Sequence, residues 1–255
     1  PHPRGAAREK ATGSRRPPPS RKNPPTPTPT ASPPLPAATP PKELVIINEV
    51  GWMGTRANTG SEWIELYNPG NTDIVLNGWK LTAVRSPFEV VLAGTIKAKK
   101  FFLLGRRLSP TDPGPFLDPI ADQLYFSGST LSDSGEYIQL KAPNGFVVDT
   151  ANKDGGTWPA GNAFYPPNDK LSYCSMERNS YKSPEKPGMW VTNDFTRTFG
   201  HDQLNNKICG TPGKPNWALG KIPTPTISPT PTLTPRPTST FYCYYCTRTI
   251  TPTPK

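Results

Sequence analysis

Apolar and polar residues form short runs along residues 44–217, and each run has the length of a β-strand. The run at residues 44–47 (LVII) is continuously apolar. Residues 62–67 (EWIELY) alternate instead, which places Ile64 and Leu66 on one face of a strand and Glu65 on the other. Further strands are expected at residues 74–76, 79–81, 89–92, 101–104, 137–140 and 146–148. Sustained 3.6-residue periodicity with helix caps is absent from the sequence, so we expect an all-β fold.

The turns between these runs indicate how the strands connect. Asn144-Gly145 separates two β-rich runs, and an Asn-Gly pair in that position is a strong marker of a hairpin. Seven or eight short strands at roughly ten-residue spacing are typical of a β-sandwich. The strand pattern fades from about residue 155, so residues 155–217 are expected to form a loop-rich extension of that sandwich.

Composition divides the chain into three parts. Of the 36 prolines, 14 lie in residues 1–43 and 8 in residues 218–255, where they alternate with threonine and leave little apolar surface to bury. We expect both flanks to be disordered, extended linkers around one domain at 44–217. As alternatives to a plain spacer, Thr/Pro repeats also suit a glycosylated stalk or a docking site for a partner.

Charge follows the same division. The net charge is +6 in residues 1–43, zero in residues 44–217 and +4 in residues 218–255. The basic balance therefore belongs to the flanks, whereas a domain built to hold nucleic acid through its phosphates normally keeps a positive excess of its own. The sequence has no apolar stretch of about 18 residues, so we expect no membrane insertion. It has no visible signal peptide and opens with Pro1, so we expect a fragment or a processed product.

Several separated motifs resemble the lamin tail domain family. They are residues 47–50 (INEV), 62–68 (EWIELYN) and 76–81 (LNGWKL). Further elements resemble the bacterial branch of that family: residues 149–152 (DTAN), 156–161 (GTWPAG), 175–178 (SMER) and 210–213 (GTPG). The resemblance implies an immunoglobulin-like β-sandwich, used as an accessory binding module. In bacteria such modules accompany secreted or surface-associated hydrolases and nucleases, and in nuclear lamins they contact proteins and nucleic acid.

The residues offer little for catalysis, and the resemblance transfers no catalytic residue. The two histidines are His2, in the N-terminal flank, and His201, and no nucleophile-elbow, zinc-ligand or phosphate-loop motif accompanies either of them. A carboxylate-based hydrolase remains a third hypothesis, and it requires a concave pocket that holds at least two members of one set. That set is Glu49, Glu62, Asp149, Asp154 and His201, and Glu65 is a further candidate acid or base beside Glu49 and Glu62.

Three other groups of residues are candidates for binding or cross-linking. Asp149, Asn152 and Asp154 lie on a Gly-containing loop whose oxygens suit calcium, although a hydrogen-bonded turn explains them as well. Lys97, Lys99, Lys100, Arg106 and Arg107 cluster around the strand at 101–104. They could form a basic ridge for nucleic acid or another anion, or simply guard a sheet edge.

The four cysteines fall into two pairs. Cys174 and Cys209 lie within the predicted domain and could form a disulfide in an exported protein, or stay unpaired and buried. Cys243 and Cys246 have C-x-x-C spacing, but they lie in the Thr/Pro flank without a second pair of metal ligands. We therefore expect no cofactor other than a possible calcium ion.

From the sequence we expect an extracellular or cell-surface binding module. Its ligand would be a protein or a cell-surface polymer, with nucleic acid as the alternative.

Overall fold

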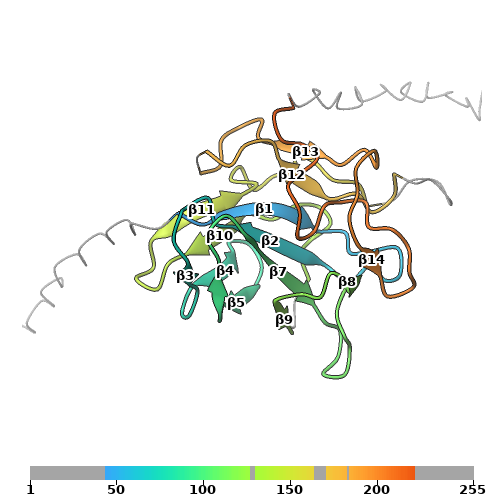
Figure 1. Cartoon of the computed structure of the whole chain (residues 1–255), viewed down its shortest axis with the longest axis horizontal. Coiled ribbons are helices and arrows are strands. Elements are labelled where there is room, and N and C mark those ends of the chain that lie inside the picture. The colour runs from blue at the N-terminus through green and yellow to red at the C-terminus, as the bar shows by residue number, and fades with distance from the viewer. Residues whose placement is uncertain (1–43, 127–129, 164–170, 183, 222–255) are drawn as a thin grey trace, which may run out of the picture. The chain divides into compact units, whose positions relative to one another are not determined.

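The structure is a computed structural model that describes residues 44–126, 130–163, 171–182 and 184–221. The N-terminal linker (1–43) with His2, nearly all of the predicted C-terminal linker, and Cys243 and Cys246 lie outside the described residues. Every regular element in the described part is a β-strand (Figure 1). No helix there is long and apolar enough to cross a membrane.

The strands are short and follow one another closely along the chain. Their bounds are β1 (Ile46–Gly51), β2 (Trp63–Tyr67), β3 (Ile74–Val75), β4 (Lys80–Ala83), β5 (Glu89–Val91), β6 (Thr95–Ile96), β7 (Phe101–Arg106), β8 (Phe116–Asp118), β9 (Gln123–Tyr125), β10 (Ile138–Lys141), β11 (Val147–Ala151), β12 (Met176–Arg178), β13 (Trp190–Thr192) and β14 (His201–Asp202).

Two sheets form the sandwich. The larger sheet has the strand order β13-β12-β1-β2-β7-β9, and the smaller one has the order β11-β10-β4-β5. All neighbours are antiparallel except β7 and β9, which run parallel. Two further strand pairs, β14-β8 and β3-β6, complete the described part. The all-β, immunoglobulin-like sandwich expected from the sequence is the fold of this domain.

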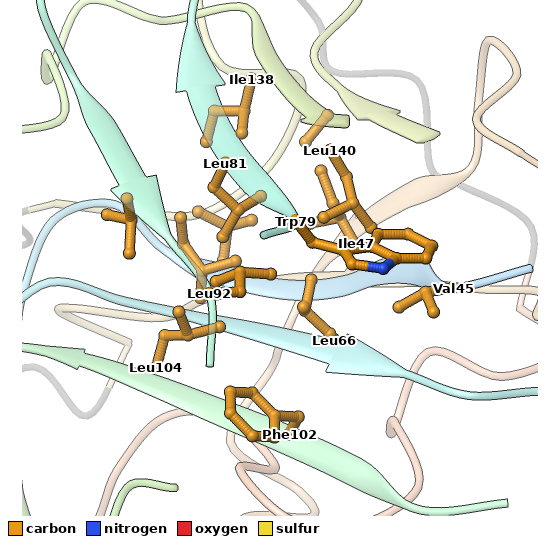
Figure 2. Packing of buried hydrophobic residues seen from close by; sticks show 14 of the residues in the cluster. Val45, Ile47, Leu66, Trp79, Leu81, Leu92, Phe102, Leu104, Ile138 and Leu140 are labelled. Atoms are coloured by element: carbon orange, nitrogen blue, oxygen red, sulfur yellow. The ribbon is translucent and has the colours of Figure 1, made fainter. Parts of the chain in front are cut away.

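The main core fills the space between the two sheets. Ile47 and Leu66 from the larger sheet meet Leu81 and Leu140 from the smaller one, and all four are fully buried (Figure 2). Trp79, which follows the Asn77-Gly78 turn, packs into this core. Burial of large aliphatic and aromatic side chains at about 25 cal/mol per Å² of apolar surface is the main stabilising contribution here.

The outer face of the larger sheet is also covered. Trp63 and Leu103 point to this face and form a second, smaller core with Phe116 of β8 and with Ile208. The segment around residues 193–218 crosses the same face and donates hydrogen bonds to it. Glu65 lies on this face too, opposite Ile64 and Leu66 as the alternation predicts. The crossing segment buries it completely, so the polar face of this strand does not face solvent at Glu65.

The C-terminal part of the domain is more ordered than its pattern indicates. Strands β12 and β13 lie in the stretch read as loop-rich, and β12 pairs directly with β1, as the adjacent blue and orange strands in Figure 1 show. Each has three residues, too few for a hydrophobic period to be recognised. The fold also continues past the predicted boundary at residue 217, because Ala218 is fully buried and its N–H donates to Glu177 Oε2 (2.9 Å).

Candidate ligand-binding pocket

A pocket of about 910 Å³ opens beside the start of β7, where the chain enters the domain. Its volume falls in the range usual for ligand sites. The lining residues come from the chain before β1, from β2, from the loop that leads to β3 and the first residue of β3, from the turn before β7 and from the loop after β12. They are Leu44, Tyr67, Pro69, Gly70, Thr72, Asp73, Ile74, Lys99, Tyr181 and Lys182.

Aromatic rings form one wall of this pocket. The ring centroids of Tyr67 and Tyr181 lie 4.3 Å apart at 37°, and Phe101 packs against Tyr67 at 4.9 Å. All three side chains are only partly buried. The backbone N–H of Asn216 donates to the Tyr181 hydroxyl (3.0 Å), which fixes the ring in place. The wall is therefore a preformed apolar surface with accessible ring faces.

Charged groups line the rim. Asp73 accepts hydrogen bonds from the Lys97 ammonium (2.8 Å) and the Ala98 N–H (2.9 Å), and these lower the pKa of its carboxyl group. Lys99 and Lys182 are exposed, and Lys99 donates to the carbonyl of Pro69. Burial raises the pKa of the Tyr67 and Tyr181 phenols above 10. The pKa of Asp73 thus moves further below pH 7, and the pKa values of Tyr67 and Tyr181 move further above it. General acid–base catalysis needs a pKa near the working pH, so these groups suit binding better than proton transfer.

The predicted basic ridge is not continuous. Lys97, Lys99 and Lys100 lie before β7, but Arg106 and Arg107 lie at its other end, about 17 Å away for a strand of this length. Arg106 is buried, and its guanidinium donates to the carbonyl of Gly60 (2.7 Å). A ridge through all five side chains is therefore wrong, and only its N-terminal part borders the pocket.

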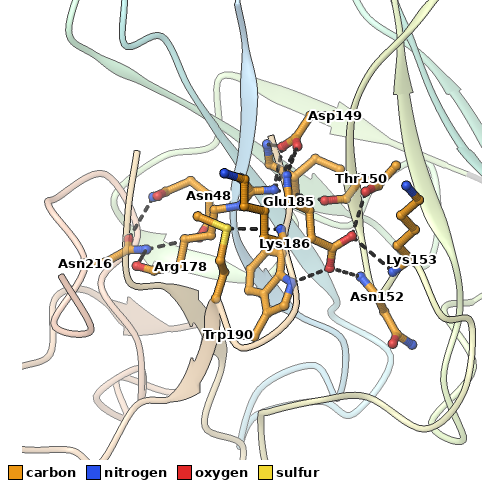
Figure 3. A network of polar contacts seen from close by, with 12 residues as sticks. Asn48, Asp149, Thr150, Asn152, Lys153, Arg178, Glu185, Lys186, Trp190 and Asn216 are labelled. Carbon is orange, nitrogen blue, oxygen red and sulfur yellow. Dashed lines mark hydrogen bonds and ion pairs between the residues drawn. The ribbon is translucent and has the colours of Figure 1, made fainter. Parts of the chain in front are cut away.

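The predicted calcium loop is occupied by internal contacts (Figure 3). Arg178 Nη2 lies 2.9 and 2.7 Å from the two carboxylate oxygens of Asp149, which also accept the N–H groups of Ile47 and Glu185. Asn152 turns its amide inward to the carbonyls of Glu136 and Gly156, while Asp154 points to solvent. The three predicted ligands do not converge, and the described residues contain no group of three or more metal-binding side chains.

The carboxylate of Glu185 accepts the hydrogen bonds that this loop offers. The backbone N–H groups of Asn152 and Lys153 donate to the side chain of Glu185 (2.7 and 3.0 Å), and so do Thr150 Oγ1 and Trp190 Nε1 (both 2.6 Å). Asn152 has a positive φ of 56°, which turns successive N–H groups toward one point. Glu185 therefore fastens the loop before β13 to the end of β11.

The candidate catalytic carboxylates are also spread among structural roles. Glu49 and Glu65 sit side by side on β1 and β2 with Glu177 of β12, all buried beneath the crossing segment. Thr211 donates from its N–H to Glu49 (2.9 Å), and its hydroxyl lies within hydrogen-bonding distance of Glu49 (3.2 Å) and Glu177 (2.9 Å). Burial raises the pKa of all three carboxyl groups. They anchor the covering segment and line none of the described pockets.

The remaining candidates lie elsewhere. Glu62 is buried and accepts the N–H of Leu131 (2.9 Å). His201 pairs with Asp118 (2.9 Å) on the small β14-β8 sheet. Of the whole carboxylate and histidine set, only Asp154 lines a described pocket, one of about 150 Å³. In the described part of the chain, the geometry does not supply the pocket that the hydrolase hypothesis requires.

Cys174 and Cys209 form a disulfide that closes a loop with a sequence separation of 35 residues. Of the two alternatives for these cysteines, the structure has the paired one. The bond joins the residue two positions before β12 to the segment that covers the buried carboxylates, next to the residues that contact Glu49.

Comparison with known proteins agrees with this architecture. Residues 38–154 match the family model of the lamin tail domain. The match supports the resemblance drawn from the sequence motifs, and the lamin tail domain is an immunoglobulin-like, non-catalytic domain family. A search of curated proteins found no match.

The matched segment contains only part of the pocket. Eight of the ten lining residues belong to the lamin tail domain match, whereas Tyr181 and Lys182 come from the C-terminal extension. Sequence reasoning selected Lys99 as a candidate and missed Tyr67 and Tyr181. Tyr67 and Tyr181 lie more than a hundred positions apart, so no local sequence pattern indicates that their rings meet. Tyr67, at the end of an alternating strand, was the one residue of the pair that the sequence could have marked as a candidate.

Proposed function

We propose that this domain is a non-catalytic binding module that holds a protein or a cell-surface polymer in the aromatic pocket. The observation that supports this proposal is the close contact of the Tyr67 and Tyr181 rings beside Lys99 and Lys182. Ring faces bind apolar or ring-shaped groups, and flanking ammonium groups orient polar ones.

Two features support a place outside the cell. The disulfide between Cys174 and Cys209 suits an oxidising compartment. The Thr/Pro-rich flanks have the composition of extended spacers that would hold the domain away from a neighbour or surface. We propose an exported or surface-associated protein in which the domain, of the bacterial lamin tail type, presents its pocket at the end of such a tether.

The same pocket favours single-stranded nucleic acid as a second candidate ligand. A base could stack on Tyr67 or Tyr181 while Lys99 and Lys182 approach the phosphates. In that role the domain would be the accessory nucleic-acid-binding part of an extracellular nuclease or DNA-uptake protein. The zero net charge of residues 44–217 weighs against this candidate.

A titration of the full chain tests both ligands. Wild type and Tyr181→Leu are titrated with soluble cell-wall polymer and with single-stranded DNA at about 50 and about 200 mM salt. Phe126→Leu is the matched control, because Phe126 is an exposed aromatic residue (57 %) that does not line the pocket. We expect polymer binding that Tyr181→Leu weakens by about fivefold and that salt changes little, since the loss of one ring contact is worth about 1 kcal/mol.

The results separate the candidates. DNA binding that falls steeply with salt and depends on Tyr181 would favour the nucleic-acid function. Equal binding by wild type, Tyr181→Leu and Phe126→Leu would remove the pocket from the proposal. Circular dichroism on each variant checks that the sheet content is unchanged.

A further inference from the structure

We propose that the aromatic pocket and a groove beside it together bind a linear, uncharged glycan whose sugars carry acetamido groups. The inference rests on the proposed function of the pocket as a ligand site and names the chemical class of the polymer. Three features of this surface carry it: accessible ring faces, exposed ammonium donors beside an ionised carboxylate, and the continuation of the pocket into a second hollow.

The pocket continues past Asp73 and Ile74 into a second hollow of about 530 Å³, here called the Val75 groove. Asp73 and Ile74 line both hollows, so the two adjoin at the start of β3. Val75 is 60 % exposed on the wall of the groove. The other lining residues are Trp79, Ala142, Pro143 and Asn144. Two adjoining hollows suit an extended polymer better than a compact ligand.

The rings of Tyr67 and Tyr181 supply a surface on which a sugar can stack. Their centroids lie 4.3 Å apart, so the rings touch each other and a ligand must lie on their outer faces. A pyranose ring is amphipathic in the same sense as a tyrosine side chain, because one face presents C–H groups and the rim carries hydroxyl groups. Its C–H face can therefore pack on the aromatic wall while the polar rim points to the charged groups.

An acetamido group matches the polar groups of the pocket. Hydrogen bonds from Lys97 and from a backbone N–H lower the pKa of the Asp73 carboxyl, so it is an ionised acceptor, and about half of its side chain is exposed. Lys182 is exposed, and Lys99 uses one of its three N–H groups on the carbonyl of Pro69. An acetamido group donates one N–H, accepts at its carbonyl oxygen and carries a methyl group that suits an apolar wall.

Asp73 also acts against charged polymers. Its carboxylate lies where the two hollows adjoin, so an anionic chain that runs through both must pass beside a like charge. Asp73 is the only ionisable group among the described residues that line the Val75 groove. An uncharged chain meets no such penalty, and its hydrogen bonds to Asp73, Lys99 and Lys182 are of the strong, charge-assisted kind.

The experiment titrates the full chain with two hexasaccharides by isothermal titration calorimetry. One consists of β-1,4-linked N-acetylglucosamine and the other of β-1,4-linked glucose, so they differ only in the acetamido groups. We expect the N-acetylated hexasaccharide to bind on the order of tenfold more tightly, because only it offers an amide N–H and a carbonyl to the charged groups.

Variants in the pocket separate stacking from hydrogen bonding. Tyr181→Leu should weaken both hexasaccharides by about fivefold, because both stack on the ring. Lys182→Ala should weaken the N-acetylated one by about fivefold and the glucose one by less than about twofold. The matched control is Lys153→Ala, since Lys153 is an exposed lysine that lines neither the pocket nor the Val75 groove.

Chain length tests the Val75 groove. The N-acetylated disaccharide is short enough to occupy the aromatic pocket alone, so the hexasaccharide should bind more tightly. Val75→Ser should weaken the hexasaccharide by about threefold and leave the disaccharide unchanged. Val84→Ser is the control, because Val84 is 55 % exposed and lines neither hollow.

Four outcomes would overturn the inference. They are equal binding of the two hexasaccharides, N-acetylated binding that Tyr181→Leu and Lys182→Ala leave unchanged, equal binding of disaccharide and hexasaccharide, and tighter binding of a polyuronate that falls steeply with salt. Cell-wall polymer that binds through Tyr181 while neither hexasaccharide binds would end the inference and leave the proposed function standing. Loss of every Tyr181-dependent ligand would end both.

Discussion

Glu62 is a buried carboxyl group whose titration should be visible in the stability of the domain. Burial raises its pKa to about 8 and nearby Asp133 adds to the shift, while the Leu131 N–H and Arg106 oppose it. A group with a raised pKa in the folded state stabilises fully below its unfolded pKa, and this stability is lost as pH rises through the folded value. For Glu62 the window runs from about pH 4.5 to about pH 8.

We therefore predict that the free energy of unfolding falls by roughly 2–4 kcal/mol between pH 5 and pH 8 because of Glu62, at about 1.4 kcal/mol per pKa unit. Urea denaturation at the two pH values measures the change. Glu62→Gln keeps the size of the side chain and cannot ionise, so the fall should be smaller in this variant by that amount. Equal pH dependence in wild type and Glu62→Gln would refute the prediction.

Arg178 and Asp149 form a buried ion pair in which both side chains are fully inaccessible. Removal of one partner leaves the other charge buried without compensation, and in such pairs this costs about 3–5 kcal/mol. We predict a loss of that size for Arg178→Met alone, measured by denaturant unfolding. The double variant Arg178→Met with Asp149→Leu should recover part of the loss, and a double variant less stable than the sum of the singles would contradict this account.

The loop around Asp149 shows which contacts of single residues could be predicted from the sequence. Asp149, Asn152 and Asp154 form an oxygen-rich loop, and oxygen-rich loops bind calcium when their ligands converge. The alternative of a hydrogen-bonded turn holds for Asn152. The partners of Asp149 and the loop, Arg178 and Glu185, lie about thirty or more positions away and could not be paired with them from spacing alone.

At the scale of elements, the segment of residues 193–218 behaves as a strap across the larger sheet. Its N–H and hydroxyl groups reach the three buried glutamates, and the disulfide fixes its course at Cys209. A cross-link that closes a loop of about 35 residues is typically worth 2–4 kcal/mol.

We predict that Cys174→Ser with Cys209→Ser lowers the free energy of unfolding by about 3 kcal/mol, measured by urea denaturation. Wild type treated with a reductant should reproduce the effect. If reductant lowers the stability of the double serine variant as much as that of wild type, the disulfide is not the source of the change.

The strands themselves were predictable where they were long or alternating. β1, β2, β7, β10 and β11 each bury several apolar residues, and their runs mark them in the sequence. β8, β9, β12, β13 and β14 have two or three residues and exist because a neighbouring strand pairs with them, so local pattern cannot find them. The Asn144-Gly145 turn was found, although only Gly145 has a positive φ.

For the whole molecule, the sandwich could be inferred from its strands and motifs, but the pocket could not. Tyr67 and Tyr181 meet only because β12 adds to β1 and the loop after it turns back over the sheet. The distribution of net charge between the flanks and residues 44–217, by contrast, follows from composition alone. It can therefore be predicted for the intact chain without any knowledge of the fold.

That partition predicts how the intact chain meets nucleic acid. The basic excess lies in the flanks, so weak DNA binding by the full chain should come from residues such as Arg15, Arg16, Arg21 and Lys22. Each phosphate contact contributes about 0.7 to the slope of log K against log salt for single strands. We predict that changing these four residues to Gln reduces the slope by up to about 3, measured by fluorescence anisotropy with an oligonucleotide. Lys99→Gln with Lys182→Gln should leave the slope nearly unchanged; the opposite ranking would place DNA in the pocket instead of on the flank.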